Sequence, residues 1–206
     1  MSIVKLNNRG VRSATTFGSI TGLGSMVFIK KLTASSSATL SFVDGTSSVV
    51  LDSTYKEYLF IFNNMHPADD DAKFQFNLSA DSGSNYNVTK TTAVHRAYHT
   101  EAGAAPTLEY YPSEDLAQST AFQTIAAEIG NANDESVSGY LHLFNPSSTT
   151  FVKHFMTNAG QNTYHNLAMQ TLTAGYGNTT SAVDAVQFKM DTGNIDAGTI
   201  QLIGIT

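Results

Sequence analysis

The histidines and acidic residues are the side chains of this chain best suited to chemistry, but their spacing forms no metal site. His95 and His99 lie in a segment that alternates like a β-strand, where residues four apart are separated by about 13 Å. Asp69, Asp70 and Asp71 share one turn without the ligand spacing of a calcium-binding loop. We expect a solvated acidic turn there, with calcium bound between subunits as the alternative, and no cofactor.

Nucleophilic and general acid–base catalysis also lack a recognisable arrangement. The chain has no cysteine, and no Gly-x-Ser-x-Gly motif is present. Glu101, Glu109, Glu114 and Asp115 fall in one irregular stretch, but no spacing selects a pair for glycoside cleavage. We therefore expect no catalytic residues and no enzyme activity. A glycan hydrolase or lyase is the weakest of three alternatives.

Four tyrosines in expected loops could bind a ligand. These are Tyr86, Tyr110, Tyr111 and Tyr164. Loop tyrosines on a β-protein can stack on sugar rings, and nearby Asn and Asp side chains can bind hydroxyl groups. The alternative is that the four rings pack against a neighbouring subunit.

The composition favours a protein that buries its surface against other molecules. Charged residues make up 14% of the 206 residues, against about 25% in a typical soluble domain. Serine and threonine together number 46. Since no apolar run is long enough to cross a membrane and no signal peptide is visible, we expect synthesis in a cytoplasm and no membrane insertion.

Positive charge is concentrated at the start of the chain. No acidic residue precedes Asp44, so the first 43 residues carry +5 and the rest carries −11. The basic residues of this segment are Lys5, Arg9, Arg12, Lys30 and Lys31. We interpret residues 1–25 as an extended arm that docks on an acidic partner through Lys5, Arg9 and Arg12, with a solvated tail as the alternative. The acidic remainder gives no reason to expect a nucleic-acid partner.

Residues 26–206 read as one all-β body. Short alternating segments are separated by turns, and no repeat of fixed period occurs. The expected strands are 26–32, 38–43, 55–65, 73–79, 88–100, 136–144, 151–157, 167–176, 183–190 and 199–206. Nine or ten strands with long connections predict an antiparallel β-sandwich, and a jelly roll is the favoured version.

Four local expectations are specific enough to test. Segment 55–65 is apolar on both faces, which predicts a central strand buried on both sides. Segment 116–129 has partial helical spacing and predicts a short helix. The turn at 145–148 predicts a hairpin, and 158–166 predicts a polar loop.

Several framing segments resemble a known group of proteins. These segments are 5–11, 28–37, 55–58, 143–146, 186–190 and 193–200. Together they resemble a group of small virion proteins common in tailed bacteriophages of marine bacteria. The resemblance covers most of the chain, is least clear over 101–135, and includes no catalytic motif. It implies a peripheral virion component with a β-sandwich body, either a head decoration or cement protein or a fibre.

The composition and this resemblance favour a non-enzymatic structural protein on the outside of a phage particle. Its arm would bind other virion proteins, and its sandwich would contact copies of itself. A homo-oligomer is expected, and a trimer is favoured by analogy with viral jelly rolls. The alternative is a tail-fibre or receptor-recognition module that binds a host-surface glycan.

Deleting residues 1–24 should leave a folded, soluble body that no longer joins the particle, because the deletion removes Lys5, Arg9 and Arg12. Occupancy on purified particles measures this. Normal occupancy of the truncated protein would show that the arm is not the anchor.

Overall fold

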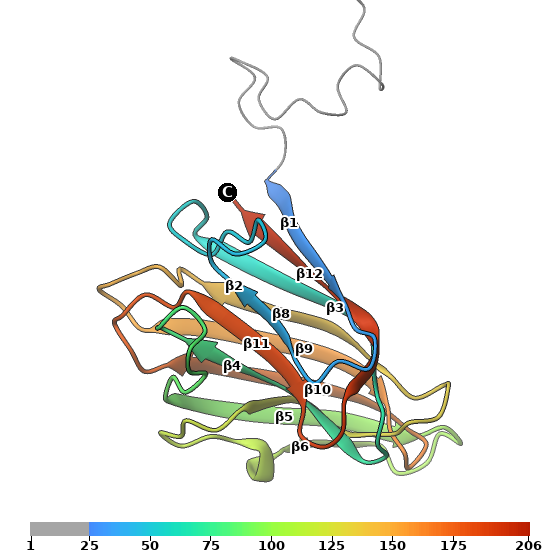
Figure 1. The fold of residues 1–206 in the computed structure, drawn as a ribbon. Coiled ribbons are helices and arrows are strands. Elements are labelled where there is room, and N and C mark those ends of the chain that lie inside the picture. The colour runs from blue at the N-terminus through green and yellow to red at the C-terminus, as the bar shows by residue number, and fades with distance from the viewer. Residues whose placement is uncertain (1–24) are drawn as a thin grey trace, which may run out of the picture.

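The computed structural model describes residues 25–206, which form two antiparallel β-sheets packed face to face (Figure 1). The larger sheet has the strand order β1 (Met26–Thr33), β12 (Ile195–Ile205), β3 (Glu57–Pro67), β8 (Val137–Phe144), β9 (Lys153–Asn162), β10 (Leu167–Gly177), β5 (Lys90–Thr100) and β6 (Thr107–Tyr110). The smaller sheet has the order β2 (Leu40–Val43), β11 (Ala185–Met190), β4 (Ala72–Ser79) and β7 (Gln123–Ile129). The expected antiparallel β-sandwich is confirmed, with twelve strands among the described residues.

The finer expectations about the architecture remain predictions. The sheets have eight and four strands, and their order does not by itself establish a jelly roll. The expected arm, with Lys5, Arg9 and Arg12, lies outside the described residues. Within residues 25–206 there is no helix long and apolar enough to span a membrane.

The expected hairpin is confirmed. Strands β8 and β9 pair along their length, with Tyr140 opposite Asn158, and Asn145 begins the connecting turn in a left-handed conformation (φ 45°). Strand β3 is interior, as expected, because it lies between β12 and β8. The expected burial of both its faces is wrong, because Leu59 and Ile61 are only half-buried. The smaller sheet covers the opposite face of β3.

The expected helix over 116–129 is wrong. This stretch contains β7, which pairs with β4, and the preceding 3₁₀ turn η1 (Pro112–Glu114) is the helical element nearby. The first five residues of β7 are all buried, so burial on both sides hides the alternation that marks a strand. Pairing with β4 satisfies the backbone and outweighs the weak helical spacing.

The expected polar loop over 158–166 is wrong in its first half. Strand β9 continues to Asn162, and Ala159 and Gln161 are buried there. The polar side chains of this segment suggested a loop, because an interior strand is usually apolar. Here the interior of the sandwich is itself polar. Buried Thr157, Thr171 and Thr173 belong to the same region, where β7 packs against β9 and β10.

The other half of the interior is an aromatic core centred on Phe188 of β11. The Phe188 ring stacks on Phe74 with centroids 5.8 Å apart and contacts Phe60 at 5.6 Å. Phe42 and Phe76 complete the cluster, at 6.3 and 6.4 Å. All five side chains are completely buried. Since Phe60 belongs to the larger sheet and the other four to the smaller one, this cluster joins the two layers.

Replacing Phe188 with alanine should lower the free energy of unfolding by about 3–5 kcal/mol, because it leaves a cavity between four rings. Urea denaturation measures the change. Phe151→Ala is the control, because Phe151 is 69% exposed and its loss should cost under about 0.5 kcal/mol. Equal effects of the two substitutions would contradict the assignment of the core.

Candidate functional site

The outer face of the eight-stranded sheet is the main candidate site, and it is almost uncharged over six of its eight strands. Lys31 of β1, opposite Gln201 of β12, adds a positive charge near the edge of this face. Alternate residues of its strands point away from the smaller sheet. Across β3, β8, β9, β10, β5 and β6 these outward positions include Leu59, Ile61, Tyr140, His142, Phe144, His154, Met156, Leu172, Ala174, Ala93, His95, His99, Leu108 and Tyr110. Glu57 is the one charged residue at the outward positions of these six strands.

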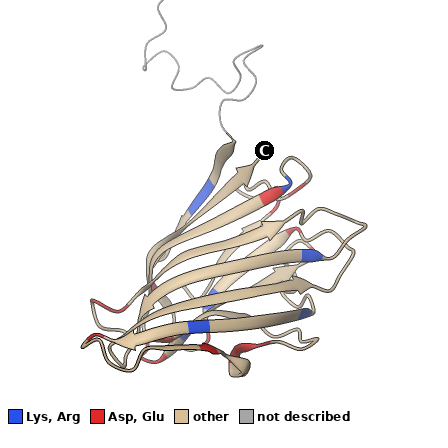
Figure 2. Cartoon of the chain, turned by 180° about the vertical axis from the view of Figure 1, so that it is seen from behind, with Lys and Arg blue, Asp and Glu red and all other residues tan. Residues whose placement is uncertain are grey.

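The rest of the described chain is strongly acidic. Residues 25–206 contain 8 basic and 17 acidic residues, a net charge of −9. Figure 2 views the molecule from behind, and the long strands on this side carry few charged residues. Arg96 and Lys153, which belong to β5 and β9, direct their side chains inward to Glu128 and to the Phe151 carbonyl. The acidic residues lie mainly in loops and at the sheet ends.

Two shallow hollows mark this face. One, of about 470 Å³, has Ala93 and Ala174 in its floor and His154, Met156 and Tyr176 around it. The second, of about 710 Å³, lies farther along β5 and β10. Its lining includes Ala97, Ala168 and Leu108, and most of the lining is apolar.

Large apolar side chains project beside these hollows. Leu108 is 79% exposed, Met156 is 52% exposed and Leu172 is 42% exposed. Exposed apolar residues are ordinary when scattered, but here they share one sheet face with the two hollows. The face therefore presents both projections and recesses to a partner.

Four of the six histidines lie on this face. His142 contacts the Glu57 carboxylate at 2.8 Å and packs on Phe144 with ring centroids 4.0 Å apart. His95 meets Tyr110 edge to face at 5.3 Å. No group of three His, Cys, Asp or Glu residues capable of holding a metal occurs within residues 25–206.

The four tyrosines singled out in the sequence do not form one site. Tyr110 lies on the outer face, half exposed, with its hydroxyl bonded to Asp115. Tyr86 lies in the loop after β4, where its carbonyl accepts a hydrogen bond from Asn77. Tyr164 lies in the loop after β9, with its ring 3.8 Å from that of His165.

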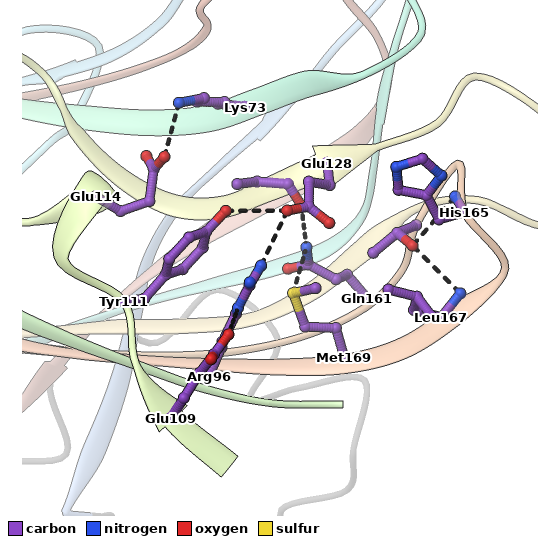
Figure 3. A network of polar contacts seen from close by, with 12 residues as sticks. Lys73, Arg96, Glu109, Tyr111, Glu114, Glu128, Gln161, His165, Leu167 and Met169 are labelled. Carbon is purple, nitrogen blue, oxygen red and sulfur yellow. Dashed lines mark hydrogen bonds and ion pairs between the residues drawn. The ribbon is translucent and has the colours of Figure 1, made fainter. Parts of the chain in front are cut away.

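Tyr111 belongs to a polar network inside the edge of the sandwich (Figure 3). Its hydroxyl donates to Glu128 at 3.0 Å, and the Arg96 guanidinium lies 3.9 Å from its ring centroid. Burial and the neighbouring Glu128 carboxylate raise the pKa of Tyr111. This ring is already held by protein groups, which makes it a poor platform for a sugar.

Arg96 links three strands in this network. Its Nε binds Glu109 of β6 at 2.7 Å, and its Nη1 binds Glu128 of β7 at 2.9 Å. Glu128 has a left-handed backbone (φ 61°), a strained conformation for a side chain of this kind. Nearby, Lys73 pairs with the buried Glu114 at 2.7 Å and fastens η1 to β4 (Figure 3). These three ion pairs hold η1, β6 and β7 to the strands beside them at this edge of the sandwich.

The acidic turn after β3 is also held by local contacts. Asp69 accepts a hydrogen bond from the Thr192 hydroxyl at 2.9 Å, and Gly193 packs so closely that a Cβ there would clash with this carboxylate. A solvated turn at Asp69–Asp71 stays the prediction, with calcium bound between subunits as its alternative.

The expectation that the sandwich contacts copies of itself did not name the residues of the outer face. The usable signal was the alternation over 167–177, where every outward residue of β10 is uncharged.

Comparison of the chain with protein-family models, curated proteins and solved structures found no match.

Replacing Arg96 with methionine should destabilise the fold by about 1–3 kcal/mol, because two carboxylates then lose their shared cation. Solvent screens part of this effect, since Glu109 is 40% exposed. Urea denaturation measures the change, and Lys56→Met, at an exposed position, is the control. Equal stability of the Arg96 variant and the unaltered protein would mean that the network does not hold the edge.

Proposed function

We propose that this chain is a non-enzymatic structural protein of a tailed bacteriophage particle, and that it decorates the outside of the head. It would be a homo-oligomer, with a trimer favoured, in which the outer face of the eight-stranded sheet packs against another copy. Residues 1–25 would anchor it to other virion proteins. The observation that carries this proposal is the uncharged outer face on an acidic body.

Charge favours a second copy as the occupant of this face. Two bodies that each carry −9 repel one another wherever their acidic loops meet. The outer sheet face is where two copies can approach without bringing like charges together. A partner chosen for electrostatic attraction would instead need a charged surface to bind, and this face offers Glu57, already in contact with His142, and Lys31 near its edge.

The shape of the face favours the same partner. Leu108 and Met156 project, while Ala93 and Ala174 form the floor of a recess. In a trimer, one part of this surface on each copy meets a different part on the next copy, and a surface that carries both projections and recesses can supply both sides of such an interface. The resemblance to phage virion proteins and the basic leading segment support an assembly role independently.

A tail-fibre or glycan-binding module is the second candidate. The observation in its favour is the pair of exposed rings of His95 and Tyr110 on the outer face. Against it, Tyr86, Tyr111 and Tyr164 lie apart and make contacts within the chain. Binding of host-surface glycans by a stable monomer would favour this second function.

The full-length protein should self-associate at micromolar concentration, and Leu172→Glu should weaken that association at least about tenfold, because like charges would meet in the interface. Light scattering across a concentration series measures this. Thr46→Glu adds the same charge at an exposed turn after β2 and is the matched control.

The unaltered protein behaving as a monomer throughout this range would contradict self-association. Equal weakening by Thr46→Glu would show that total charge matters and that the outer face does not.

A further inference from the structure

Lys90, the first residue of β5, is buried inside the sandwich without an acidic partner among the described residues. Its side chain is completely inaccessible. Its Nζ contacts the side-chain oxygen of Asn77 and donates to the Val88 carbonyl at 2.8 Å. Burial lowers the pKa of Lys90 to about 7, so much of this amine is uncharged near neutral pH. An uncharged lysine amine is a nucleophile.

Asn77, in β4, presents an immobilised amide to this amine. The residue is completely buried. Its Oδ1 accepts the Leu78 N–H at 2.8 Å, and its Nδ2 donates to the carbonyls of Tyr86 at 2.6 Å and Thr120 at 3.0 Å. Both hydrogens of the amide nitrogen are therefore bound, and the group cannot rotate without losing these contacts.

We propose that Lys90 and Asn77 join in an intramolecular isopeptide bond. The Lys90 Nζ attacks the Asn77 Cγ, and the Nζ–Cγ bond forms as the Cγ–Nδ2 bond breaks. The attacking nitrogen gives up one proton and the leaving nitrogen takes one, so the Nδ2 group departs as ammonia. The product is a secondary amide, and no oxidant or other reactant is required.

The surroundings favour each part of this step. The Lys90 Nζ contacts Asn77 Oδ1, and Cγ is bonded directly to that oxygen. The reacting atoms are therefore held close together, and the attack needs a small movement of the amine in place of a diffusive encounter. The Leu78 N–H stabilises negative charge that develops on Oδ1. The two carbonyls bound to Nδ2 raise the electron density on that nitrogen and so favour its protonation.

This bond would connect the two layers of the sandwich. Asn77 belongs to the four-stranded sheet and Lys90 to the eight-stranded sheet. A covalent link between them would hold the layers together at the end of the molecule opposite the turn of Asp69–Asp71.

Lys153 provides a matched control within the same chain. It is also completely inaccessible, and burial also lowers its pKa. Its Nζ donates to the backbone carbonyls of Phe151 at 2.7 Å and Thr179 at 3.2 Å. No side-chain amide accepts a hydrogen bond from it among the described residues, so it has no equivalent reaction.

The experiment is mass spectrometry of the purified full-length protein after incubation at pH 8. We expect an intact mass lower by one ammonia molecule and, after proteolysis, a branched peptide that joins Asn77 to Lys90. Lys153→Met should keep the branched peptide, and Lys90→Met should lack it. At pH values below 7 the rate of formation should fall by about tenfold per pH unit, as the uncharged amine becomes scarce.

An intact mass equal to that of the sequence after prolonged incubation would overturn the proposal. Loss of ammonia that maps to another asparagine, without a branched peptide, would also overturn it. Neither result depends on self-association, so this test is separate from that of the proposed function.

Discussion

The contact between the two unequal sheets determines where the apolar residues of this chain can be buried. The rings of Phe60 and Phe188 meet across the interface and hold the layers together. A smaller sheet can cover one side of the larger one, so alternate residues of every long strand are left on the outer side. In an isolated sandwich those positions are usually polar or charged. Here they carry Leu59, Ile61 and Leu172, which is why the outer face is central to the proposed function.

Much of the fold could be predicted from the sequence because most strands alternate clearly. Along β4, for example, Phe74, Phe76 and Leu78 occupy alternate positions, and all three are completely buried. The predictions failed where both faces of a strand have the same polarity. Strand β7 is buried on both sides and resembled a helix, and β9 continues through polar residues that resembled a loop. Alternation shows which residues share a face, but it does not show what covers that face.

The candidate site was predicted less well than the fold. Loop tyrosines were selected by residue type, but the contacts of Tyr111 with Arg96 and Glu128 depend on β7 packing beside β5, which no local pattern reveals. The outer face was indicated indirectly, through the low charged fraction and the apolar pattern of 55–65. Burial of Lys90 beside Asn77 was not predicted, because the two residues lie in different sheets and neither has a distinctive sequence context.

Oxidation of Met156 tests most directly whether the outer face is buried between copies. This side chain is 52% exposed in a single chain and lies beside the hollow floored by Ala93 and Ala174. The rate at which dilute peroxide oxidises it can be followed by mass spectrometry at increasing protein concentration, with the buried Met169 as an internal reference. We expect the Met156 rate to fall several-fold as copies associate, while the Met169 rate stays low throughout. A Met156 rate that is independent of concentration, in a protein that does associate, would place the interface elsewhere.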